Sequence, residues 1–494
     1  MSFLKADLSL VNKYMDEADA LKEEIENSKT NVEITGTKYY VSAEGNDDND
    51  GLTPETPWKT IEKVNKTMFS YGDGVFFRRG DSFRQTYSLE AKKGMTYSAY
   101  GEGPKPKLIC SLDASDKSLW LETECENIYR YAEKLPGDTR DVGCIIFDGG
   151  KCWGIKIEER DNGERLDIGR VFNGLEWYDV TNAKFTDYRD LKNDLEYYHD
   201  FDSEYLYLYS INGNPGDRFE SIELADKGHG IFLGCCIDTT IDNLEIYGSG
   251  SHGVAGHDMY NVTVQYCTFK WIGGSIQGRR AYGRDHGVRF GNAVESYGSS
   301  DNFVIHHCYA SHVYDCCWTV QIFGPAIMRN IKMHDNLSEF CNTGLEVWQK
   351  NGLLTNMDLY HNYSRFNGYG WSHQRPFKDS NFYYGANGLA RVSFGNHVRD
   401  NINLFCSVQS HYARATGKDH YNFHDNIYFM EKDKLIGGIC EMPWSSEGNW
   451  PTSTPYDEKN VNELQSKGFE PGSIFYITEK EPFGKNMYTL CTEL

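Results

Sequence analysis

A short phrase repeats along the middle of the chain and constrains its fold more than any other feature. Each copy alternates apolar and polar residues, then places a polar residue and finally Asn or Cys. Taken as equivalent, these final residues are Asn243, Cys267, Cys308, Asn336, Asn362, Asn401 and Asn426. They lie 24, 41, 28, 26, 39 and 25 residues apart. A period in the twenties indicates repeated units that bury their apolar faces only against their neighbours.

Each repeat has the pattern expected of one rung of a parallel β-helix. A short alternating run is followed by a polar or glycine turn and a second short run, and such alternation is typical of half-buried strands. The steps of 41 and 39 residues are expected where a loop is inserted on one face, and inserted loops commonly carry function. We therefore predict an all-β solenoid, a parallel β-helix, over residues 36–430.

Three segments depart from the repeat. Residues 1–35 place apolar residues at helical spacing, which predicts an amphipathic helix that caps the open end of the stack or, alternatively, mediates dimerisation. Residues 150–225 carry tyrosine-rich alternating runs and are predicted to form β-hairpins in an insertion. Residues 431–494 lose the period and are predicted to form an irregular C-terminal cap. A homo-oligomer is compatible with this organisation.

The charge and the cysteines of the chain limit its partners and its location. With a formal net charge of −22 over 494 residues, neither nucleic acid nor an anionic membrane is an expected partner. The sequence has no run of about 18 apolar residues that would predict a membrane span. It shows no secretion signal, and its 14 cysteines follow neither zinc-binding spacing nor a disulfide framework. We therefore expect free thiols and a cytoplasmic location.

No metal or other cofactor is expected from the sequence. Residues 46–51 mimic part of a calcium loop, but Pro57 stands where an EF-hand needs the carboxylate of its twelfth position. His252, His257 and His286 are accompanied by no ligand pattern that would favour zinc.

Two stretches near the N-terminus resemble a known family. Residues 38–61 end in Pro57-Trp-Lys-Thr-Ile61 and are followed by Gly72-Asp-Gly-Val75. They resemble the opening of right-handed parallel β-helix proteins of the pectin-lyase-like superfamily, in which a first strand leads into a turn, a short helix and a second strand. Residues 194–210 are similar to a stretch in glycoside-hydrolase-like members. The resemblance implies a right-handed β-helix and a carbohydrate-active enzyme.

The second strands of successive rungs predict a column of outward side chains. Aligned through their glycines and their alternation, three strands place Glu295, Thr319 and Glu346 on one outward face, because successive side chains of a strand point to opposite faces. Glu295 and Glu346, two rungs apart, have the separation expected for an inverting glycosidase, whereas Asp315 paired with either glutamate suits a retaining enzyme. These three carboxylates are the leading catalytic candidates.

A long loop beside this column supplies further candidates. The loop at residues 278–287 carries arginines suited to clamp a carboxylate or sugar hydroxyls, and its Asp285 is a fourth acid or base candidate. The predicted substrate-binding residues are Arg280, Arg284, His286, Gln321, Trp348, Gln349, His373 and Arg375.

The same region resembles β-helix glycoside hydrolases. Gly291-Asn-Ala-Val-Glu295, Tyr314-Asp315 and Thr319-Val-Gln321 are similar to a set that recurs in those enzymes, although Ala293 stands where the pattern favours glycine. The resemblance implies hydrolysis of oligosaccharides, as in β-xylosidase, xylanase or fucosidase, and lacto-N-biosidase members.

We therefore expect a glycoside hydrolase that cleaves oligosaccharides with two carboxylates. A polysaccharide lyase is the alternative enzyme, and Lys270 is the one lysine placed on a rung as its base, without an acidic cluster that would bind calcium. A non-catalytic carbohydrate-binding β-helix is the third class.

Overall fold

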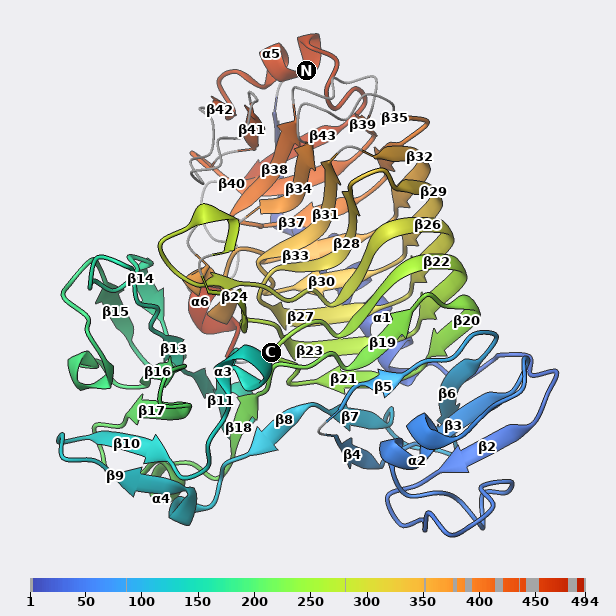
Figure 1. Ribbon diagram of the computed structural model, residues 1–494. Coiled ribbons are helices and arrows are strands. Elements are labelled where there is room, and N and C mark those ends of the chain that lie inside the picture. The colour runs from blue at the N-terminus through green and yellow to red at the C-terminus, as the bar shows by residue number, and fades with distance from the viewer. Residues whose placement is uncertain are drawn as a thin grey trace.

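The chain winds into a right-handed parallel β-helix, as the repeat and the resemblance predict. The computed structural model describes residues 3–85, 87–279, 281–350, 352–375, 380–386, 393–413, 421–434, 436–440, 453–478 and 487–492. Within them the rungs stack from the blue and green N-terminal strands to the orange and red C-terminal strands, and an insertion projects to one side (Figure 1).

Three parallel sheets form the sides of the stack. Sheet 1 has eleven strands, and all of its pairings are parallel. In spatial order these strands are β4 (Ser82–Arg84), β7 (Lys107–Ile109), β21 (Glu245–Tyr247), β23 (Thr268–Ile272), β27 (Tyr309–Val313), β30 (Leu337–Glu339), β33 (Tyr363–Arg365), β37 (Ile402–Leu404), β40 (Ile427–Glu431), β43 (Ile474–Thr478) and β1 (Leu4–Lys5).

Sheet 2 begins with the first rung of the helix and continues along its length. In spatial order its strands are β2 (Lys38–Val41), β3 (Gly74–Arg78), β6 (Thr96–Tyr100), β20 (Ile237–Asp242), β22 (Val254–Gln265), β26 (Val294–His306), β29 (Ile327–His334), β32 (Leu353–Tyr360), β36 (His397–Arg399) and β39 (Asn422–His424). A short strand, β35 (Ser393–Phe394), also pairs with β32.

Sheet 3 shares β22 and β26 with sheet 2, because these long strands pair with one set of neighbours through their first halves and with another through their second halves. Its other strands are β5 (Leu89–Glu90), β19 (Ile231–Gly234), β28 (Cys316–Phe323), β31 (Thr343–Lys350), β34 (Ser380–Ala386), β38 (Val408–Ala413) and β41 (Gly437–Cys440). The last of these pairs antiparallel with β42 (Ser453–Tyr456).

One apolar core runs through the inside of the stack. On sheet 2, strand alternation turns Val264, Ile305, Met333, Leu359 and Val398 inward as direct partners on successive strands. All five are fully buried. Each rung thus packs against the rungs above and below it, which is the reason for the sequence period.

A ladder of asparagines lines one corner inside the helix. The Asn336 side chain donates to Oδ1 of Asn362, that of Asn362 to Asn401, and that of Asn401 to Asn426, over 2.9, 2.9 and 3.1 Å. The same oxygens accept backbone N–H groups, as Oδ1 of Asn401 does from Asn362. Each buried amide is therefore satisfied by the next rung, and the ladder fixes the order and register of the rungs.

The alignment of the ladder is wrong at its first member. Strand pairing makes Leu244, not Asn243, the partner of Cys267. Asn243 lies one residue earlier, at a corner with a φ of +56°, where Tyr266 and His307 have similar values. Asparagine tolerates this left-handed conformation. Asn243 therefore stands at the corner for a conformational reason, although in the sequence it looks like a member of the ladder.

The N-terminal helix lies along the stack and does not cap its end, contrary to the prediction. Helix α1 (Leu8–Asn27) begins after Asp7, whose side chain accepts a hydrogen bond from the N–H of Leu10. It buries its apolar residues against sheet 1, behind the strands in Figure 1. Ion pairs from Lys22 to Glu339 at 2.7 Å and from Asp19 to Arg365 at 2.6 Å join it to separate rungs. An amphipathic pattern shows that a face is covered, not what covers it.

The residues around a second, short helix join the core at the first rung. Helix α2 (Ile61–Lys66) packs near β5, and its Ile61 and Val64 belong to the core together with Trp58. The Trp58 ring stacks on Tyr39 of β2 at 4.9 Å. Apolar cover at this end therefore comes from the segment between β2 and β3.

The insertion starts earlier than predicted, near residue 111 and not near residue 150. It lies between β7 and β19 and forms antiparallel sheets with one parallel pairing, β13 with β16. Its strands are β8 (Ser111–Asp113), β9 (Trp120–Glu122), β10 (Ile128–Tyr131), β11 (Ile145–Phe147), β12 (Cys152–Trp153), β13 (Ile155–Lys156), β14 (Gly169–Phe172), β15 (Trp177–Val180), β16 (Glu196–Asp200), β17 (Tyr205–Tyr209) and β18 (Ile222–Ala225). Two single-turn helices, α3 (Gly137–Arg140) and α4 (Pro215–Arg218), lie between them.

The C-terminal segment contributes one more rung, which the loss of period did not predict. Strand β43 pairs in parallel with β40, and β1 adds to its other edge. Between β42 and β43, helix α5 (Val461–Ser466) leads to Glu470, which accepts a hydrogen bond from Asn426 at 3.1 Å and terminates the asparagine ladder. A last short helix, α6 (Met487–Leu490), follows.

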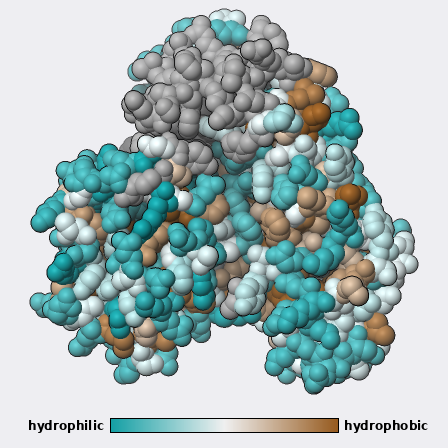
Figure 2. Space-filling model, viewed as in Figure 1, coloured by the Kyte–Doolittle hydropathy of each residue, from teal (hydrophilic) through white to brown (hydrophobic). Residues whose placement is uncertain are grey.

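The structure agrees with the sequence in the polar character of two surface regions and in the state of the described cysteines. In the view of Figure 2 the insertion and the N-terminal rungs form two mainly hydrophilic lobes with a notch between them. The thirteen cysteines whose side chains the structure describes form no disulfide, and most are buried, as the prediction of thiols outside a disulfide framework requires. Among the described residues no helix is long and apolar enough to cross a membrane.

Breaking the asparagine ladder should destabilise the whole stack. Asn362→Ala removes the acceptor of Asn336 and the donor to Asn401 and Met333, and each buried polar group left without a partner costs about 1 to 3 kcal/mol. We expect urea unfolding to show a loss of roughly 2 to 4 kcal/mol. Asn12→Ala, at an exposed position of α1, is the control, and an equal loss in both variants would contradict a special role for the ladder.

Candidate active site

Three neighbouring strands of sheet 3 carry the predicted column of outward side chains. Glu295 of β26 is the direct partner of Thr319 of β28, which is the partner of Glu346 of β31. The residues that precede them point inward and are buried, as the predicted register requires. Although they point away from the core, the two glutamates are only 7% and 2% exposed. The column is therefore a shielded site and not an exposed strand face.

The backbone before Glu295 depends on glycine. Gly291 has a φ of +133°, and a Cβ at this position would lie 2.2 Å from Cα of Gly273 on the preceding rung. Only glycine allows this close approach, which brings Asn292 beside the carboxyl group of Glu295. Asn292 donates to Oε2 of Glu295 at 2.6 Å and accepts the N–H of Cys316 at 2.9 Å.

Glu295 is held in an environment that favours its neutral form. Burial, with the nearby charges of Glu346 and Asp315, raises its pKa to about 8, against the opposing effect of the Asn292 hydrogen bond. Below that pH the carboxyl group carries a proton. A buried carboxyl group with neighbouring carboxylates is the arrangement by which proteins keep an acid ready to donate near neutral pH.

The contact with His252 agrees with a protonated Glu295. Nδ1 of His252 accepts the backbone N–H of Asn292 at 2.9 Å, and it also lies 3.0 Å from Oε2 of Glu295. Burial lowers the pKa of His252 well below its usual value, so the ring is neutral. Since Nδ1 accepts the N–H of Asn292, it has no proton to donate to Glu295, and an ionised carboxylate at this distance would be repelled by its lone pair whereas a protonated one would not.

Asp315 supplies a carboxylate paired with a cation. It enters β28 one rung away from Glu295, and its N–H donates to the carbonyl of Gly291 at 3.1 Å. Its Oδ1 lies 2.6 Å from Nη1 of Arg375. The guanidinium group favours the ionised form of Asp315, and it is close enough to Glu346 for that carboxylate to raise the pKa of Arg375 as well.

Arg375 is positioned by the insertion. It follows the 3-10 turn Trp371–Gln374, in which the indole N–H of Trp371 donates to the carbonyl of His312 at 2.8 Å. The side-chain amide of Gln374 donates to the carbonyl of Gly154 at 2.9 Å and accepts the N–H of Lys156 at 3.2 Å. The amide thus binds the backbone of β13 in the way a neighbouring strand would, and the insertion anchors the turn.

Glu346 accepts hydrogen bonds from two uncharged groups. Thr319 donates to its Oε2 at 3.0 Å, and Gln321 donates to the same oxygen at 3.3 Å. Trp348 is the direct partner of Gln321 in the next outward position and is half-buried. The predicted residues Gln321, Trp348 and Arg375 therefore lie in or beside the group formed by the three carboxylates.

The loop candidates lie elsewhere or outside the described residues. Asp285 forms an ion pair with Arg160 of the insertion at 2.7 Å, and the pKa of Asp285 is lowered by its hydrogen bond to that arginine. His286 is buried and its Nδ1 lies 2.6 Å from the carbonyl of Gly287. Arg284 is half-buried near the same loop. Arg280 lies outside the described residues. These contacts, with a backbone bridge between Arg160 and His286, tie both Asp285 and His286 to the insertion and not to the carboxylate column.

Two predicted binding residues have other surroundings. Gln349 points into the stack, because it is three residues after the outward Glu346; it is fully buried, donates to Gly352 at 2.8 Å and accepts a hydrogen bond from Tyr421. Its assignment to substrate binding is wrong by strand alternation. The His373 ring packs on Tyr488 of α6 at 4.9 Å.

Asn292 and His252 were missed as members of the site. His252 lies two residues before Val254, which pairs with Val294, so the rung alignment places it opposite Asn292. The alignment of the rungs therefore contained the information needed to identify His252 as a neighbour of Asn292. Aromatic rings continue from there, since His229 stacks on both His252 and Phe232.

Comparisons with known proteins find distant likenesses. The chain matches no protein-family model. A segment of 109 residues is 31% identical to a lacto-N-biosidase of Bifidobacterium longum subsp. longum and covers 20% of this chain and 7% of that protein. The chain therefore spans a small part of the length of the curated relative that it matches.

Similar solved structures carry the names of carbohydrate-active enzymes. One is named a glycoside hydrolase, with a TM-score of 0.46 and 9% identity over 92% of this chain and 98% of that chain. A lacto-N-biosidase from Eubacterium ramulus has a TM-score of 0.35 and 13% identity, over 95% and 70%. A rhamnogalacturonan lyase has a TM-score of 0.44 and 10% identity, over 90% and 83%. These names agree with the predicted resemblance, and at such TM-scores they do not bear on the activity of this chain.

The chemistry available at the column is proton transfer between carboxyl groups of unlike character. Glu295 is neutral near pH 7, Asp315 is paired with Arg375, and Glu346 accepts hydrogen bonds from two uncharged groups. Unlike environments that separate the protonation states of nearby carboxyl groups are the usual basis of paired acid and base roles.

The raised pKa of Glu295 should make the free energy of unfolding depend on pH. The folded protein keeps a proton that the unfolded chain releases above about pH 4.5, so the wild type loses unfolding free energy as the pH rises from there to about 8. Glu295→Gln has no titrating carboxyl group at this position, so its free energy of unfolding does not show this decrease with pH. We expect its unfolding free energy relative to wild type to rise by on the order of 2 to 4 kcal/mol between about pH 5 and about pH 8. Chemical denaturation at both pH values measures the difference, and a constant difference would show that Glu295 is already ionised at pH 5.

Proposed function

We propose that this protein is a glycoside hydrolase that cleaves oligosaccharides, with Glu295 as its general acid. The observation that carries the proposal is a buried carboxyl group, protonated near neutral pH, that shares a shielded outward face with two further carboxylates. Hydrolysis of a glycosidic bond needs this combination, because one group must protonate the leaving oxygen while another activates water or attacks the sugar.

The base or nucleophile is Glu346 or Asp315, and the two assignments predict different stereochemistry of the product. Glu346 lies two strands from Glu295, at a backbone separation of about 10 Å, which leaves room for a water molecule and suits inversion. Asp315 lies on the next rung, opposite Gly291 and not opposite Glu295, and catalysis by these two carboxyl groups in close approach would proceed through a covalent intermediate with retention. Asp315 is held in an ion pair with Arg375, whereas the two donors bound to Glu346 are uncharged, and this favours Glu346 as the base.

The 109-residue segment that is 31% identical to a lacto-N-biosidase supports a hydrolase of oligosaccharides. The specific sugar is not carried over from that relative. The match makes aryl lacto-N-biosides sensible first members of a substrate panel. We also propose a cytoplasmic location, since free thiols persist in reducing compartments.

The lyase alternative loses its candidate base. Lys270 lies on sheet 1 beneath α1, where its Nζ is 3.4 Å from Glu26 and 3.8 Å from Glu245. It is paired with these carboxylates and is on a different sheet from Glu295 and Glu346. No observation therefore favours β-elimination by this residue.

Variants of the three carboxylates should separate their roles. Glu295→Gln should lower kcat for natural oligosaccharides by roughly 10²- to 10⁴-fold, and much less for dinitrophenyl glycosides, because that leaving group needs no proton. Loss of the base or nucleophile should instead lower the rates of both substrates. Glu90→Gln is the matched control, since Glu90 stands in the same register column, three strands from Glu295, and is exposed.

Equal losses with both substrates in Glu295→Gln would remove this residue from the acid role. Sugar binding without any turnover in wild type would favour the non-catalytic class, and an unsaturated uronate product would favour a lyase.

The stereochemistry of the product should identify the partner of Glu295. We expect ¹H NMR of the first product to show inversion, and Glu346→Gln to abolish hydrolysis of both substrate types. Retention, together with azide rescue of Asp315→Ala, would instead assign the nucleophile to Asp315.

A further inference from the structure

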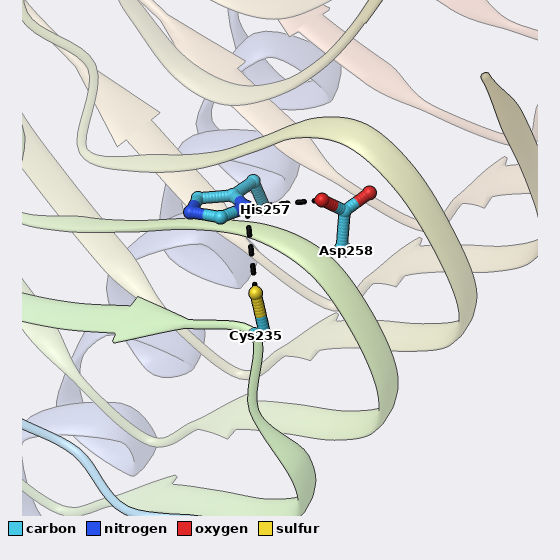
Figure 3. Close-up of side chains that lie close together, drawn as sticks. All are labelled: Cys235, His257 and Asp258. Carbon is cyan, nitrogen blue, oxygen red and sulfur yellow. Dashed lines mark hydrogen bonds and ion pairs between the residues drawn. The ribbon is translucent and has the colours of Figure 1, made fainter. Parts of the chain in front are cut away.

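A cysteine, a histidine and an aspartate converge on the surface of sheet 3, away from the three carboxylates. They are Cys235, just after β19, and His257 and Asp258 within β22 (Figure 3). Sγ of Cys235 lies 3.7 Å from Nδ1 of His257, and Oδ2 of Asp258 lies 3.1 Å from the same nitrogen. All three ligand atoms lie within 4.8 Å of one another.

The backbone places these side chains together in a way that a regular strand does not allow. Consecutive residues of a strand point to opposite faces, but the pairing of β22 shifts between His257 and Met259. Asp258, between them, has a φ of +52°. This left-handed residue interrupts the alternation, and the side chains of Asp258 and His257 meet on the same side. Gly234 pairs with Gly256, so that Cys235 follows beside His257 on the neighbouring strand.

The distances match the edges of a tetrahedral zinc site. Bonds of about 2.3 Å to sulfur and about 2.0 to 2.2 Å to nitrogen and oxygen imply S···N and N···O separations of about 3.6 and 3.4 Å. The observed separations are 3.7 and 3.1 Å. A cation can therefore be held with shifts of a few tenths of an ångström.

The same contacts argue against a Cys-His-Asp catalytic relay. In a relay the nucleophile contacts one ring nitrogen and the carboxylate contacts the other, so that a proton passes across the imidazole. Here thiol and carboxylate meet at one nitrogen, Nδ1, as Figure 3 shows. Three potential donors of electron pairs that face a single point are the arrangement that a metal ion requires.

The surroundings orient two of the three ligands. Oδ1 of Asp258 accepts the N–H of Ser299 at 3.1 Å, which leaves Oδ2 for the shared point. The His257 ring lies between Phe232 and Tyr297, with centroid distances of 6.1 and 5.2 Å. His257 is 30% and Asp258 55% exposed, and Cys235 is also exposed, so solvent reaches the fourth coordination position.

We propose that Cys235, His257 and Asp258 bind a divalent cation of the zinc type, with water or a ligand in the fourth position. Thiolate and imidazole favour Zn²⁺ over Mg²⁺ or Ca²⁺, which prefer oxygen ligands. The site stands independently of the proposed hydrolase activity. The sequence did not predict it, because Cys235 is 22 residues from His257 and only the stacking of rungs brings them together.

The position of this site suits a role beside the substrate-binding face and not in the reaction. His257 is the direct partner of Tyr297, which is the partner of Gln321, and Gln321 contacts Glu346. The cation would thus sit at the edge of the outward column, two strands from Gln321. Removal of metal should leave hydrolysis by Glu295 and its partner intact.

Cobalt titration of the full-length protein tests the site without any activity assay. Bound at a thiolate, Co²⁺ gives an intense near-ultraviolet charge-transfer band, and we expect this band to saturate at one equivalent in wild type. Cys235→Ser should abolish the band, whereas Cys125→Ser, at another cysteine that is not fully buried, should keep it. Asp258→Asn, which tolerates the same backbone conformation, and His257→Asn should each weaken Co²⁺ and Zn²⁺ binding by roughly tenfold or more.

The proposal fails if wild type shows no charge-transfer band, if the band survives in Cys235→Ser, or if Asp258→Asn and His257→Asn bind Co²⁺ as tightly as wild type. A second cluster, formed by His307, His334 and Asp335, has no thiol. Cobalt bound only there would give weak d–d bands without charge transfer, and that result would also overturn the proposal. Circular dichroism of each variant confirms that the fold is kept.

Discussion

The register of the stacked rungs is the constraint on which the rest of this structure depends. Because side chains alternate along a strand, a slip of one residue would turn Glu295 and Glu346 into the core and their apolar neighbours outward. Many parallel pairings share this register, and the asparagine ladder fixes it at a corner where each amide fits only one position of the next rung. A buried polar ladder thereby specifies the alignment of an outward site on another side of the helix.

The parts of the molecule predicted best from the sequence are those that the repeat itself encodes. The column of Glu295, Thr319 and Glu346 followed from alternation and from the glycines. The same rule, applied three residues further, would have placed Gln349 inside. The error at Asn243 has a different origin, since asparagine is favoured both in the ladder and in the left-handed corner that precedes it. Local pattern alone does not distinguish these two uses.

Elements that have no repeat partner were predicted less well. The apolar stripe of α1 indicated a covered face, yet its place along sheet 1 depends on Glu339 and Arg365, more than 300 residues away in the chain. The start of the insertion was missed because its first strands, from β8 onward, are three or four residues long, as many strands of sheet 1 are. The register shift at Asp258 was likewise missed, because it arises where β26 places two residues opposite one residue of β22 and becomes apparent only when the two strands are paired.

The insertion explains how a thin solenoid shields a polar site. A single rung face is open to solvent, and carboxylates on it would titrate as they do in water. Here Gln374 binds the backbone of β13 and fixes the turn from which Arg375 reaches Asp315. The ladder fixes the column and the insertion fixes the arginine. Three carboxyl groups can therefore share one site, because Glu295 is protonated and Asp315 is paired with Arg375. The neutral form of Glu295 is thus a consequence of the architecture: without the shielding, its pKa would fall and the acid would be lost.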